Sequence, residues 1–300
     1  MKAVRFNRFG GPDVLEIVEL SDPHPGPGEI RIAVRAAGVN PSDWRKRAGE
    51  MDPGLPQTLG YEAAGVVDEI GGDVRDVAIG DRVFGVSPYG AAQAELAILS
   101  EWATIPQTLD FAGAAVIPAV VETAARTLDR LGVTSGSTLL VYGASGSVGS
   151  AAVQLAAERG ARVIGTGSPG THAALRSLGA EPVAYGDGMS ERVKAIAPSG
   201  VDLALDAAGG GALPRLVELA GAPERVVTVA DPLGARKTGV YFSRGDAGRA
   251  TYALAHAARM AAQGRFSIAV GGTFPLADVA RAHSVGESGS LRGKIALVID

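Results

Sequence analysis

A glycine-rich segment at residues 141–157, VYGASGSVGSAAVQLAA, has the residue types and spacing of a phosphate-binding loop. Gly143, Gly146 and Gly149 stand three residues apart, between an apolar run and a run with helical spacing. Backbone N–H groups at the start of a helix, together with the helix dipole, favour a diphosphate. We expect Gly143 to permit the turn, Gly146 to let backbone approach the phosphates, and Gly149 to let helix and strand pack closely. The alternative is a tight turn that binds nothing. The predicted loop consists of Gly143, Ala144, Ser145, Gly146, Ser147, Val148 and Gly149.

The next apolar strand indicates which dinucleotide would bind. NAD-specific sites usually carry Asp or Glu at its end, about 20 residues after the glycines, to hold the ribose hydroxyls. Residues 162–176, RVIGTGSPGTHAALR, contain no carboxylate, so a 2′-phosphate meets no charge repulsion. We therefore predict NADPH rather than NADH, the alternative being a merely polar turn. The candidate partners of the phosphate are Thr166, Ser168, Thr171 and His172, with Arg176 nearby in sequence.

Apolar strands and helices alternate through the middle of the chain. Strands are expected at 137–144, 161–167, 182–186, 201–209 and 225–231, with helical segments between them. This alternation is typical of a parallel sheet covered by helices. Short β-branched runs separated by Gly and Pro fill the first third of the chain and return after Gly264. A longer helix is expected at 110–132.

These elements predict an α/β protein of two domains. Residues 112–264 would form a doubly wound, dinucleotide-binding domain. Residues 1–111 and 265–300 would form a β-rich domain, with the C-terminal segment packed against the N-terminal one. A chain of 300 residues suits two such domains.

Composition excludes several classes of function. The 28 basic and 32 acidic residues nearly balance, which favours neither nucleic acid nor an anionic membrane surface as a partner. The chain has no cysteine, so disulfides, thiolate nucleophiles and cysteine-bound zinc are excluded. There is no apolar run of the ~18 residues that a membrane helix needs. We expect a cytoplasmic protein that acts on a small molecule.

Many segments, in order and over nearly the whole chain, resemble the medium-chain dehydrogenase/reductase superfamily. The similarity is to its zinc-independent quinone oxidoreductase (zeta-crystallin-like) branch. The resemblance implies a GroES-like β-barrel domain and a Rossmann domain with the cofactor in the cleft between them. It also implies hydride transfer from NADPH to quinones or enones, and a homodimer formed through the edge of the Rossmann sheet, where 239–243, GVYFS, is a candidate edge strand. The segments are MKAVRF, AAGVNPSDWRKRAG, LGYEAAGVVDEIGGDV, GDRVFG, VYGASGSVGSAAVQLA, LRSLGAEPVAYG and GKIALVID.

The resemblance also implies roles for single residues. Asn40 would lie near the nicotinamide and the substrate, Thr123 beside the nicotinamide ring, and Tyr185 near the adenosine phosphate. Each has a plainer interpretation: a turn residue before Pro41, an ordinary helical residue and a packed aromatic. Cofactor contacts are also expected after the next two strands, at Ala208, Val229 and Ala230.

The sequence departs from the zinc-dependent members of this superfamily. Tyr61 stands where they have a histidine, and the four histidines of the chain lack metal-ligand spacing, so we predict no metal site. The loop at 47–60 lacks the tyrosine that some enoyl reductases use as a proton donor. Tyr61 could donate the proton or simply pack. Because quinol oxygens can take a proton from water, quinones are slightly favoured over enones. The alternatives are an enoyl-thioester reductase and a non-catalytic NADPH-binding protein.

Overall fold

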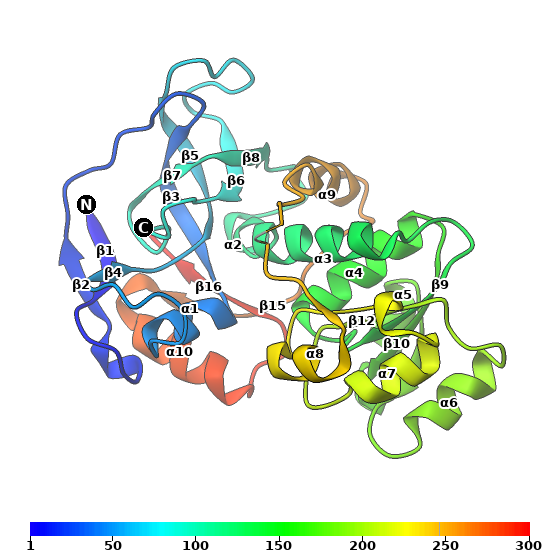
Figure 1. The fold of residues 1–300 in the computed structure, drawn as a ribbon. Coiled ribbons are helices and arrows are strands. Elements are labelled where there is room, and N and C mark those ends of the chain that lie inside the picture. Colours follow the sequence, from blue (N-terminus) through cyan, green and yellow to red (C-terminus); the bar gives the residue numbers. More distant parts are fainter. Residues whose placement is uncertain (246) are drawn as a thin grey trace. The chain divides into compact units, whose positions relative to one another are not determined.

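The computed structural model describes residues 1–245 and 247–300 and divides the chain into two compact units. The β-rich unit comprises Met1–Ala119 and Leu254–Asp300, and the α/β unit comprises Val120–Ala253. Figure 1 shows the α/β unit in green to yellow and the β-rich unit mostly in blue, cyan and red. The domain limits expected from the sequence, at 111–112 and 264–265, stay a prediction.

A parallel sheet of six strands forms the centre of the α/β unit. The strands lie in the order β11-β10-β9-β12-β13-β14, and all neighbouring pairs are parallel. Successive strands are therefore added on one side of β9 and then on the other, as in a Rossmann fold, which confirms the predicted fold class. In open sheets of this kind, ligands bind outside the carboxyl ends of the strands at the point of reversal. The strands are β9 (Thr138–Tyr142), β10 (Arg162–Gly167), β11 (Ala180–Ala184), β12 (Leu203–Asp206), β13 (Val226–Thr228) and β14 (Tyr241–Phe242).

Helices connect these strands and bury their apolar faces against the sheet. Strands covered on both faces are apolar throughout rather than alternating, which explains the continuous runs in the sequence. The core joins strand residues such as Leu140 and Ile164 to helix residues such as Val193 and Leu216. The helices are α4 (Ser147–Glu158), α5 (His172–Ser177), α6 (Met189–Ile196), α7 (Leu213–Ala220) and α8 (Pro232–Thr238).

The helix expected at 110–132 is instead two helices, α2 (Phe111–Ala115) and α3 (Pro118–Leu131). Pro118 lacks a backbone N–H, so it begins a new helix instead of continuing the first. Taken as one stretch, Phe111–Leu131 is long and apolar enough to cross a membrane, but 67% of its most apolar 18-residue segment is buried inside the protein. Core helices meet the same criterion, so this feature is weak evidence for a membrane span.

The β-rich unit contains two sheets. One has the order β2-β1-β4; in the other, β15-β16-β3-β5-β6-β8, strand β7 also pairs with β3. Because β16 pairs antiparallel with β3, the C-terminal segment joins the sheet of the N-terminal segment, as the sequence predicted. The strands are β1 (Lys2–Phe6), β2 (Glu16–Glu19), β3 (Ile30–Val39), β4 (Gln57–Thr58), β5 (Glu62–Ile70), β6 (Arg82–Val86), β7 (Leu96–Leu99), β8 (Glu101–Thr104), β15 (Val270–Pro275) and β16 (Lys294–Val298).

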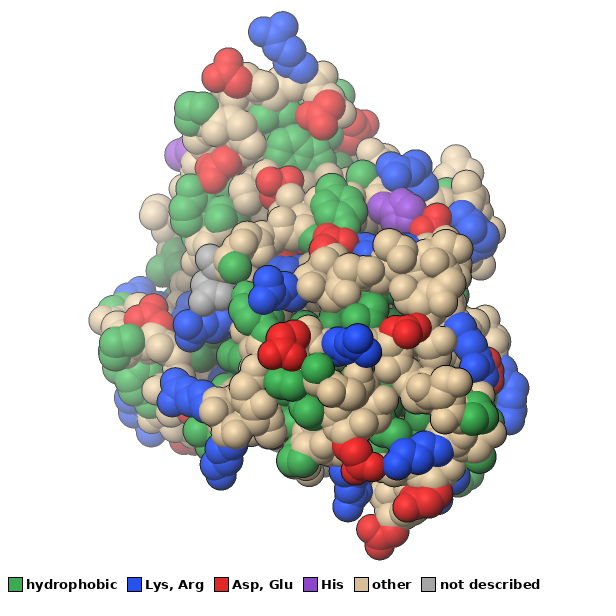
Figure 2. All heavy atoms as spheres, turned by 45° about the vertical axis from the view of Figure 1, so that its right-hand side comes forward, with side chains coloured by type: hydrophobic (Ala, Val, Ile, Leu, Met, Phe, Trp, Pro, Cys, Tyr) green, Lys and Arg blue, Asp and Glu red, His purple; other side chains and the backbone are tan. Residues whose placement is uncertain are grey.

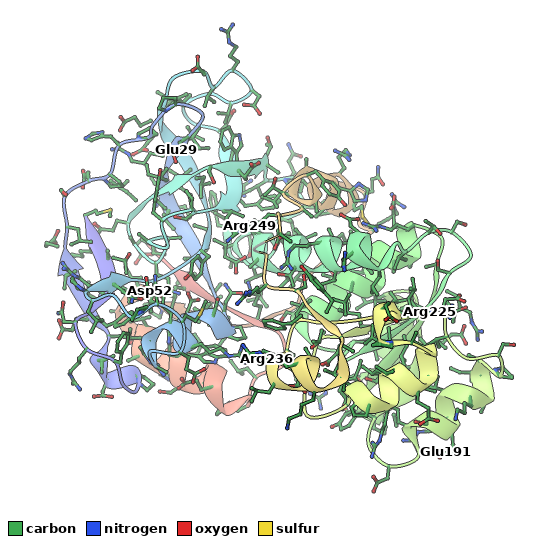
Figure 3. All side chains as sticks on the ribbon, viewed as in Figure 1. Glu29, Asp52, Glu191, Arg225, Arg236 and Arg249 are labelled. Carbon is green, nitrogen blue, oxygen red and sulfur yellow. The ribbon has the colours of Figure 1, made fainter. Side chains whose placement is uncertain are left out.

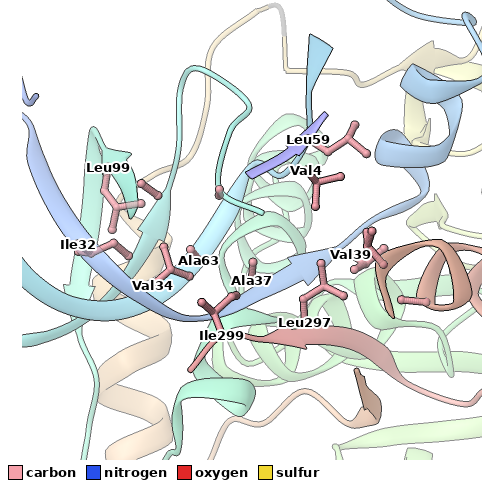
Figure 4. Close-up of a cluster of buried hydrophobic side chains, with 14 of the residues drawn as sticks. Val4, Ile32, Val34, Ala37, Val39, Leu59, Ala63, Leu99, Leu297 and Ile299 are labelled. Carbon is pink, nitrogen blue, oxygen red and sulfur yellow. The ribbon is translucent and has the colours of Figure 1, made fainter. Parts of the chain in front are cut away.

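Figure 4 shows the core of the β-rich unit, where side chains from distant parts of the sequence meet. Val4, Ile32, Leu99 and Leu297 are all fully buried there. Helices α1 (Pro41–Arg47), α9 (Ala253–Ala262) and α10 (Val279–Ser288) complete the fold. On the molecular face shown in Figure 2, acidic and basic side chains are interspersed, in keeping with the nearly balanced composition.

Candidate functional site

The three glycines after β9 have different structural roles. Gly143 has a φ of +82°, which glycine adopts without strain, and a Cβ there would lie 2.6 Å from the Cβ of Ala208. A Cβ at Gly149 would lie 2.2 Å from the carbonyl oxygen of Gly143, so α4 packs directly on the turn. A Cβ at Gly146 would meet only that oxygen, at 3.3 Å. The turn itself therefore requires Gly143 and Gly149, whereas Gly146 leaves space before α4.

The start of α4 fits a diphosphate. Gly146 is the N-cap residue, and no side chain caps the first turn or adds a negative charge to it. The first N–H groups of a helix have no partner within the helix, so they are available to an anion. Of the other predicted loop residues, Ser145 is exposed, Ser147 and Val148 are partly exposed, and Ala144 is buried.

Thr166, at the end of β10, stabilises this glycine loop. It is 1% exposed, and its hydroxyl oxygen accepts a hydrogen bond from the backbone N–H of Gly143 at 2.9 Å. Its carbonyl oxygen accepts another from Ala144 at 3.0 Å. The hydroxyl of Thr166 is thus engaged with the loop, and its predicted contact with the cofactor stays a prediction.

The other candidates for the 2′-phosphate lie in the turn after β10. Ser168, Thr171 and His172 are partly exposed. The Thr171 hydroxyl donates to the carbonyl oxygen of Ser168 at 2.7 Å, and His172 Nε2 lies 3.4 Å from the carbonyl oxygen of Gly167. The turn therefore presents hydroxyl and imidazole groups and no carboxylate, as the predicted NADPH preference requires.

Tyr185 follows β11, whose end pairs in register with the end of β10 through Gly167 and Ala184. Its side chain is 56% exposed, so it is not a packed aromatic residue. Arg192 from α6 holds this loop, because its Nη2 donates to the carbonyl oxygens of Ala184 at 3.0 Å and Asp187 at 2.8 Å. Arg192 was not predicted from the sequence, because its partners are backbone carbonyl oxygens, which carry no residue signal.

Ala208, Val229 and Ala230 follow β12 and β13 at the same edge of the sheet, where Ala208 is exposed and the other two are partly exposed. Asp206 and Thr228, the last residues of these strands, are fully buried and hydrogen-bonded to one another at 2.7 Å. Thr123 lies on α3, partly exposed, with its hydroxyl 3.5 Å from the carboxylate of Glu122. That carboxylate pairs with Arg126 at 2.7 Å.

In the β-rich unit, Asn40 lies beside a buried ion pair. The Asn40 side chain is 7% exposed, and its Nδ2 donates to the carboxylate of Glu62 at 2.8 Å. Glu62 is fully buried, pairs with the Lys294 ammonium and accepts the N–H of Ala119 at 2.7 Å. A Cβ at Gly38 would overlap the Glu62 carboxylate, so this glycine makes room for it. Glu62 therefore fixes the orientation of the Asn40 amide.

Two ionisable groups near Asn40 have shifted pKa values. Asp43 accepts the backbone N–H of Asn40 at 2.8 Å, and its burial raises the pKa of its carboxyl group to about 7. Burial also lowers the pKa of Lys46. The ammonium of Lys46 lies 5.5 Å from the centre of the half-buried Tyr61 ring.

His283, also in the β-rich unit, makes a pH-dependent contribution to stability. Arg47 Nη1 lies 3.3 Å from His283 Nδ1, which must accept because arginine has no acceptor. Burial, and to a lesser extent Arg47, lowers the pKa of His283 to about 3. The unfolded chain therefore binds a proton that the folded chain does not, so stability present above the ordinary pKa of 6.5 is lost as the pH falls below it.

We expect His283→Asn to reduce the loss of stability between pH 6.5 and 4, since an asparagine oxygen can accept from Arg47 without titrating. The slope of the free energy of unfolding against pH should differ between the wild type and His283→Asn by up to about 1.4 kcal/mol per pH unit. Asp43 acts in the opposite sense, because stability from a raised pKa falls as the pH rises from 3.8 to about 7. Both proteins contain Asp43, so its contribution cancels. Urea unfolding at several pH values measures the difference, and parallel profiles would contradict it.

Comparison with known proteins decides the family. Residues 26–124 match the alcohol dehydrogenase GroES-like domain, and residues 178–297 match the zinc-binding dehydrogenase domain. The fold matches quinone oxidoreductase of Escherichia coli, solved in complex with NADPH, with a TM-score of 0.82 at 26% identity over 100% of both chains. The chain belongs to the medium-chain dehydrogenase/reductase superfamily, in its quinone oxidoreductase branch.

Curated members of this superfamily include two similar relatives. Quinone oxidoreductase of Sus scrofa is 39% identical over 172 residues, which cover 55% of this chain and 52% of the relative. The 2-methylene-furan-3-one reductase of Solanum lycopersicum is 34% identical over 202 residues, which cover 60% of this chain and 51% of the relative. The matched part of the chain thus spans about half the length of each.

The zinc-dependent members of this superfamily use cysteine and histidine ligands. In the described parts of this chain, 1–245 and 247–300, no three histidine or acidic side chains are close enough to hold a metal ion. Glu62, the residue after Tyr61, faces an ammonium, a side-chain amide and a backbone N–H. These neighbours are all hydrogen-bond donors, so they satisfy the carboxylate without a metal.

Proposed function

We propose that this protein is an NADPH-dependent oxidoreductase that reduces quinones or other α,β-unsaturated carbonyl compounds without zinc. The observation that carries the proposal is the uncapped N-terminus of α4 behind Gly146, beside a β10 turn that has no carboxylate. The first feature suits a diphosphate and the second a 2′-phosphate. The names of the relatives from pig and tomato, and the NADPH complex of the bacterial enzyme, support both parts.

When bound, NADPH would supply the hydride. The protein would bind and orient the cofactor and the substrate, and it would exclude water. In this proposal the glycine loop binds the diphosphate, while Ser168, Thr171, His172 and Tyr185 surround the 2′-phosphate. Thr123 lies beside the nicotinamide ring. Contacts from Ala208, Val229 and Ala230 complete the binding site.

Asn40 is proposed to stabilise negative charge on the substrate. One of the two N–H groups of its amide is used by Glu62, at 2.8 Å. The other would donate to the carbonyl oxygen of the substrate, where charge develops during hydride transfer. Because Lys294 pairs with Glu62, the amide is held by a partner whose charge is compensated. Tyr61, beside Lys46, is the proposed proton donor for substrates that cannot take a proton from water.

The test is steady-state consumption of NADPH with a panel of quinones and enones. Turnover of quinones, with Tyr61→Phe close to the wild type, would support the quinone assignment with a proton from water. Turnover mainly of enones, lost in Tyr61→Phe, would make Tyr61 the proton donor of an alkene reductase. If NADPH binds but no acceptor is reduced, the reductase proposal is wrong and a non-catalytic NADPH-binding protein remains. Preferential turnover of acyl thioesters would identify an enoyl-thioester reductase.

We further propose that the protein is a cytoplasmic homodimer joined through β14, with neither membrane nor nucleic acid as a partner. β14 is at the edge of the six-stranded sheet, and the backbone groups of an edge strand can pair with a second copy. Tyr241 and Phe242 line two hollows of about 550 and 350 Å³, the larger of which also includes Arg236 of α8, labelled in Figure 3. Light scattering should give twice the chain mass of 30.4 kDa, and the mass of a single chain would contradict a dimer.

A further inference from the structure

Two buried side chains connect the loops that follow β12 and β13. Asp206 Oδ1 accepts the backbone N–H groups of Ala208 at 3.0 Å and Gly209 at 2.7 Å. Its other oxygen, Oδ2, accepts the hydroxyl of Thr228 at 2.7 Å. Asp206 and Thr228 are both 0% exposed. One carboxylate thus holds the start of the first loop and the last residue of the next strand.

Thr228 extends this connection into the second loop. Its hydroxyl oxygen accepts the backbone N–H groups of Ala230 and Asp231, both at 3.1 Å. The Asp231 carboxylate then accepts the N–H of Gly234 at 2.7 Å, in the first turn of α8. The hydrogen bond between Asp206 and Thr228 therefore couples the conformations of the two loops, in addition to the backbone bond from Val229 to Asp206 at 3.0 Å.

The first loop needs such support because it contains three glycines in succession. Gly209, Gly210 and Gly211 have φ values of +71°, +70° and +75°. Glycine has the most backbone freedom to lose, so a run of three orders only when other groups hold it. The two loops also touch: a Cβ at Gly209 would lie 3.3 Å from the carbonyl oxygen of Ala230.

The position of these loops in the sheet indicates which part of a dinucleotide they would meet. A Rossmann sheet consists of two mononucleotide-binding halves. Here β9, β10 and β11 form the first half, which carries the glycine loop, and β12, β13 and β14 form the second. The first half binds the adenosine side of a dinucleotide, so the loops after β12 and β13 belong to the nicotinamide side.

We propose that Asp206 and Thr228 are positioning residues that hold residues 207–211 and 229–231 in the shape that binds the nicotinamide half of NADPH. This inference rests on the proposed NADPH binding. Neither side chain needs to touch the cofactor, because both are buried and act through the backbone N–H groups that they fix.

The test compares two ligands on the variant Thr228→Val. Valine has nearly the same shape but neither donates to Asp206 nor accepts from Ala230 and Asp231. The dissociation constant for NADPH, measured by calorimetry, should rise roughly tenfold or more, because the loops lose their fixed geometry. The dissociation constant for adenosine 2′,5′-bisphosphate, which lacks the nicotinamide half, should be unchanged.

Two further variants separate positioning from stability. Thr127→Val makes the same change at another fully buried threonine of the α/β unit, whose hydroxyl donates to the carbonyl oxygen of Ala124 in its own helix at 2.8 Å. It should lower the melting temperature without changing either dissociation constant. Thr228→Ser retains the hydroxyl and should restore NADPH binding to within about twofold of the wild type, a level near the resolution of such measurements.

Four results would overturn the inference, and a fifth would overturn the proposed function. Unchanged NADPH binding by Thr228→Val, whatever its melting temperature, would show that the bond is only structural. Equal weakening of both ligands, or no rescue by serine, would show a general disturbance of the unit. If the wild type binds the bisphosphate but not NADPH, the nicotinamide half has no site here. If the wild type binds neither ligand, the proposed function itself fails.

Discussion

Gly146→Asp is expected to abolish NADPH binding while leaving the protein folded. The space before α4 that a diphosphate would enter would then hold a carboxylate, and repulsion between like charges should weaken binding roughly 100-fold or more. The same carboxylate is a favourable N-cap, because it can accept the N–H groups of the first turn that Gly146 leaves without a side-chain cap. Stability should therefore stay within about 0.5 kcal/mol of the wild type or rise. Calorimetry with NADPH and thermal unfolding followed by circular dichroism measure the two effects.

Gly149→Ala is the matched control, because the two glycines are three residues apart but have opposite roles. A Cβ at Gly149 would lie 2.2 Å from the carbonyl oxygen of Gly143, so α4 must move away from the turn. This overpacking should cost about 1–3 kcal/mol of stability. Gly146→Asp should therefore lose NADPH binding but keep its stability, whereas Gly149→Ala should lose stability. Normal NADPH affinity in Gly146→Asp would show that the loop is only a turn.

Glu62→Ala is expected to be the most destabilising single substitution in the β-rich unit. It leaves the Lys294 ammonium, 5% exposed, without its buried partner. It also removes the acceptor of the Asn40 amide and the Ala119 N–H. Removing one member of a buried ion pair typically costs about 3–5 kcal/mol. Urea unfolding followed by tryptophan fluorescence measures this unit selectively, because both tryptophans, Trp44 and Trp102, belong to it.

Two controls distinguish an uncompensated charge from a general loss of packing. The double variant Glu62→Leu with Lys294→Met should be less destabilised than the sum of the single variants, because no unpaired charge remains. Asp13→Ala, in the same unit, removes an exposed partner of Arg8, 3.4 Å away, and should leave unfolding unchanged. A wild-type unfolding curve for Glu62→Ala would mean that the pair does not stabilise this unit.

The sequence predicted the α/β unit well because its elements are strongly patterned. Continuous apolar strands alternate with helices that end at glycines, such as α4 before Gly160, and this pattern has few structural solutions. The β-rich unit was harder to predict at its element boundaries. Neither α1 nor β8 was expected, and the β-structure expected to return after Gly264 begins only at Val270. Short elements owe their stability to tertiary packing, and little of that is visible in local sequence.

The candidate site was predicted where local motifs define it and missed where long-range pairing defines it. The glycine loop and the turn after β10 could be identified from spacing alone. The bond between Asp206 and Thr228 could have been suspected, because each polar residue ends an apolar strand and precedes a loop. The pairing of Glu62 with Lys294 spans 232 positions in sequence, and it arises because β5 and β16 both pair with β3. No local signal could reveal it.

NADPH-dependent reduction is tested by the initial rate of cofactor oxidation with one quinone acceptor, using NADPH and NADH in parallel. The absence of a carboxylate after β10 predicts turnover with NADPH and at least roughly tenfold lower efficiency with NADH, a difference equivalent to about 1.4 kcal/mol. Faster turnover with NADH would contradict the assignment of Ser168, Thr171 and His172 to a 2′-phosphate. No turnover with either cofactor, for quinones and enones alike, would contradict the proposal that this protein is a reductase.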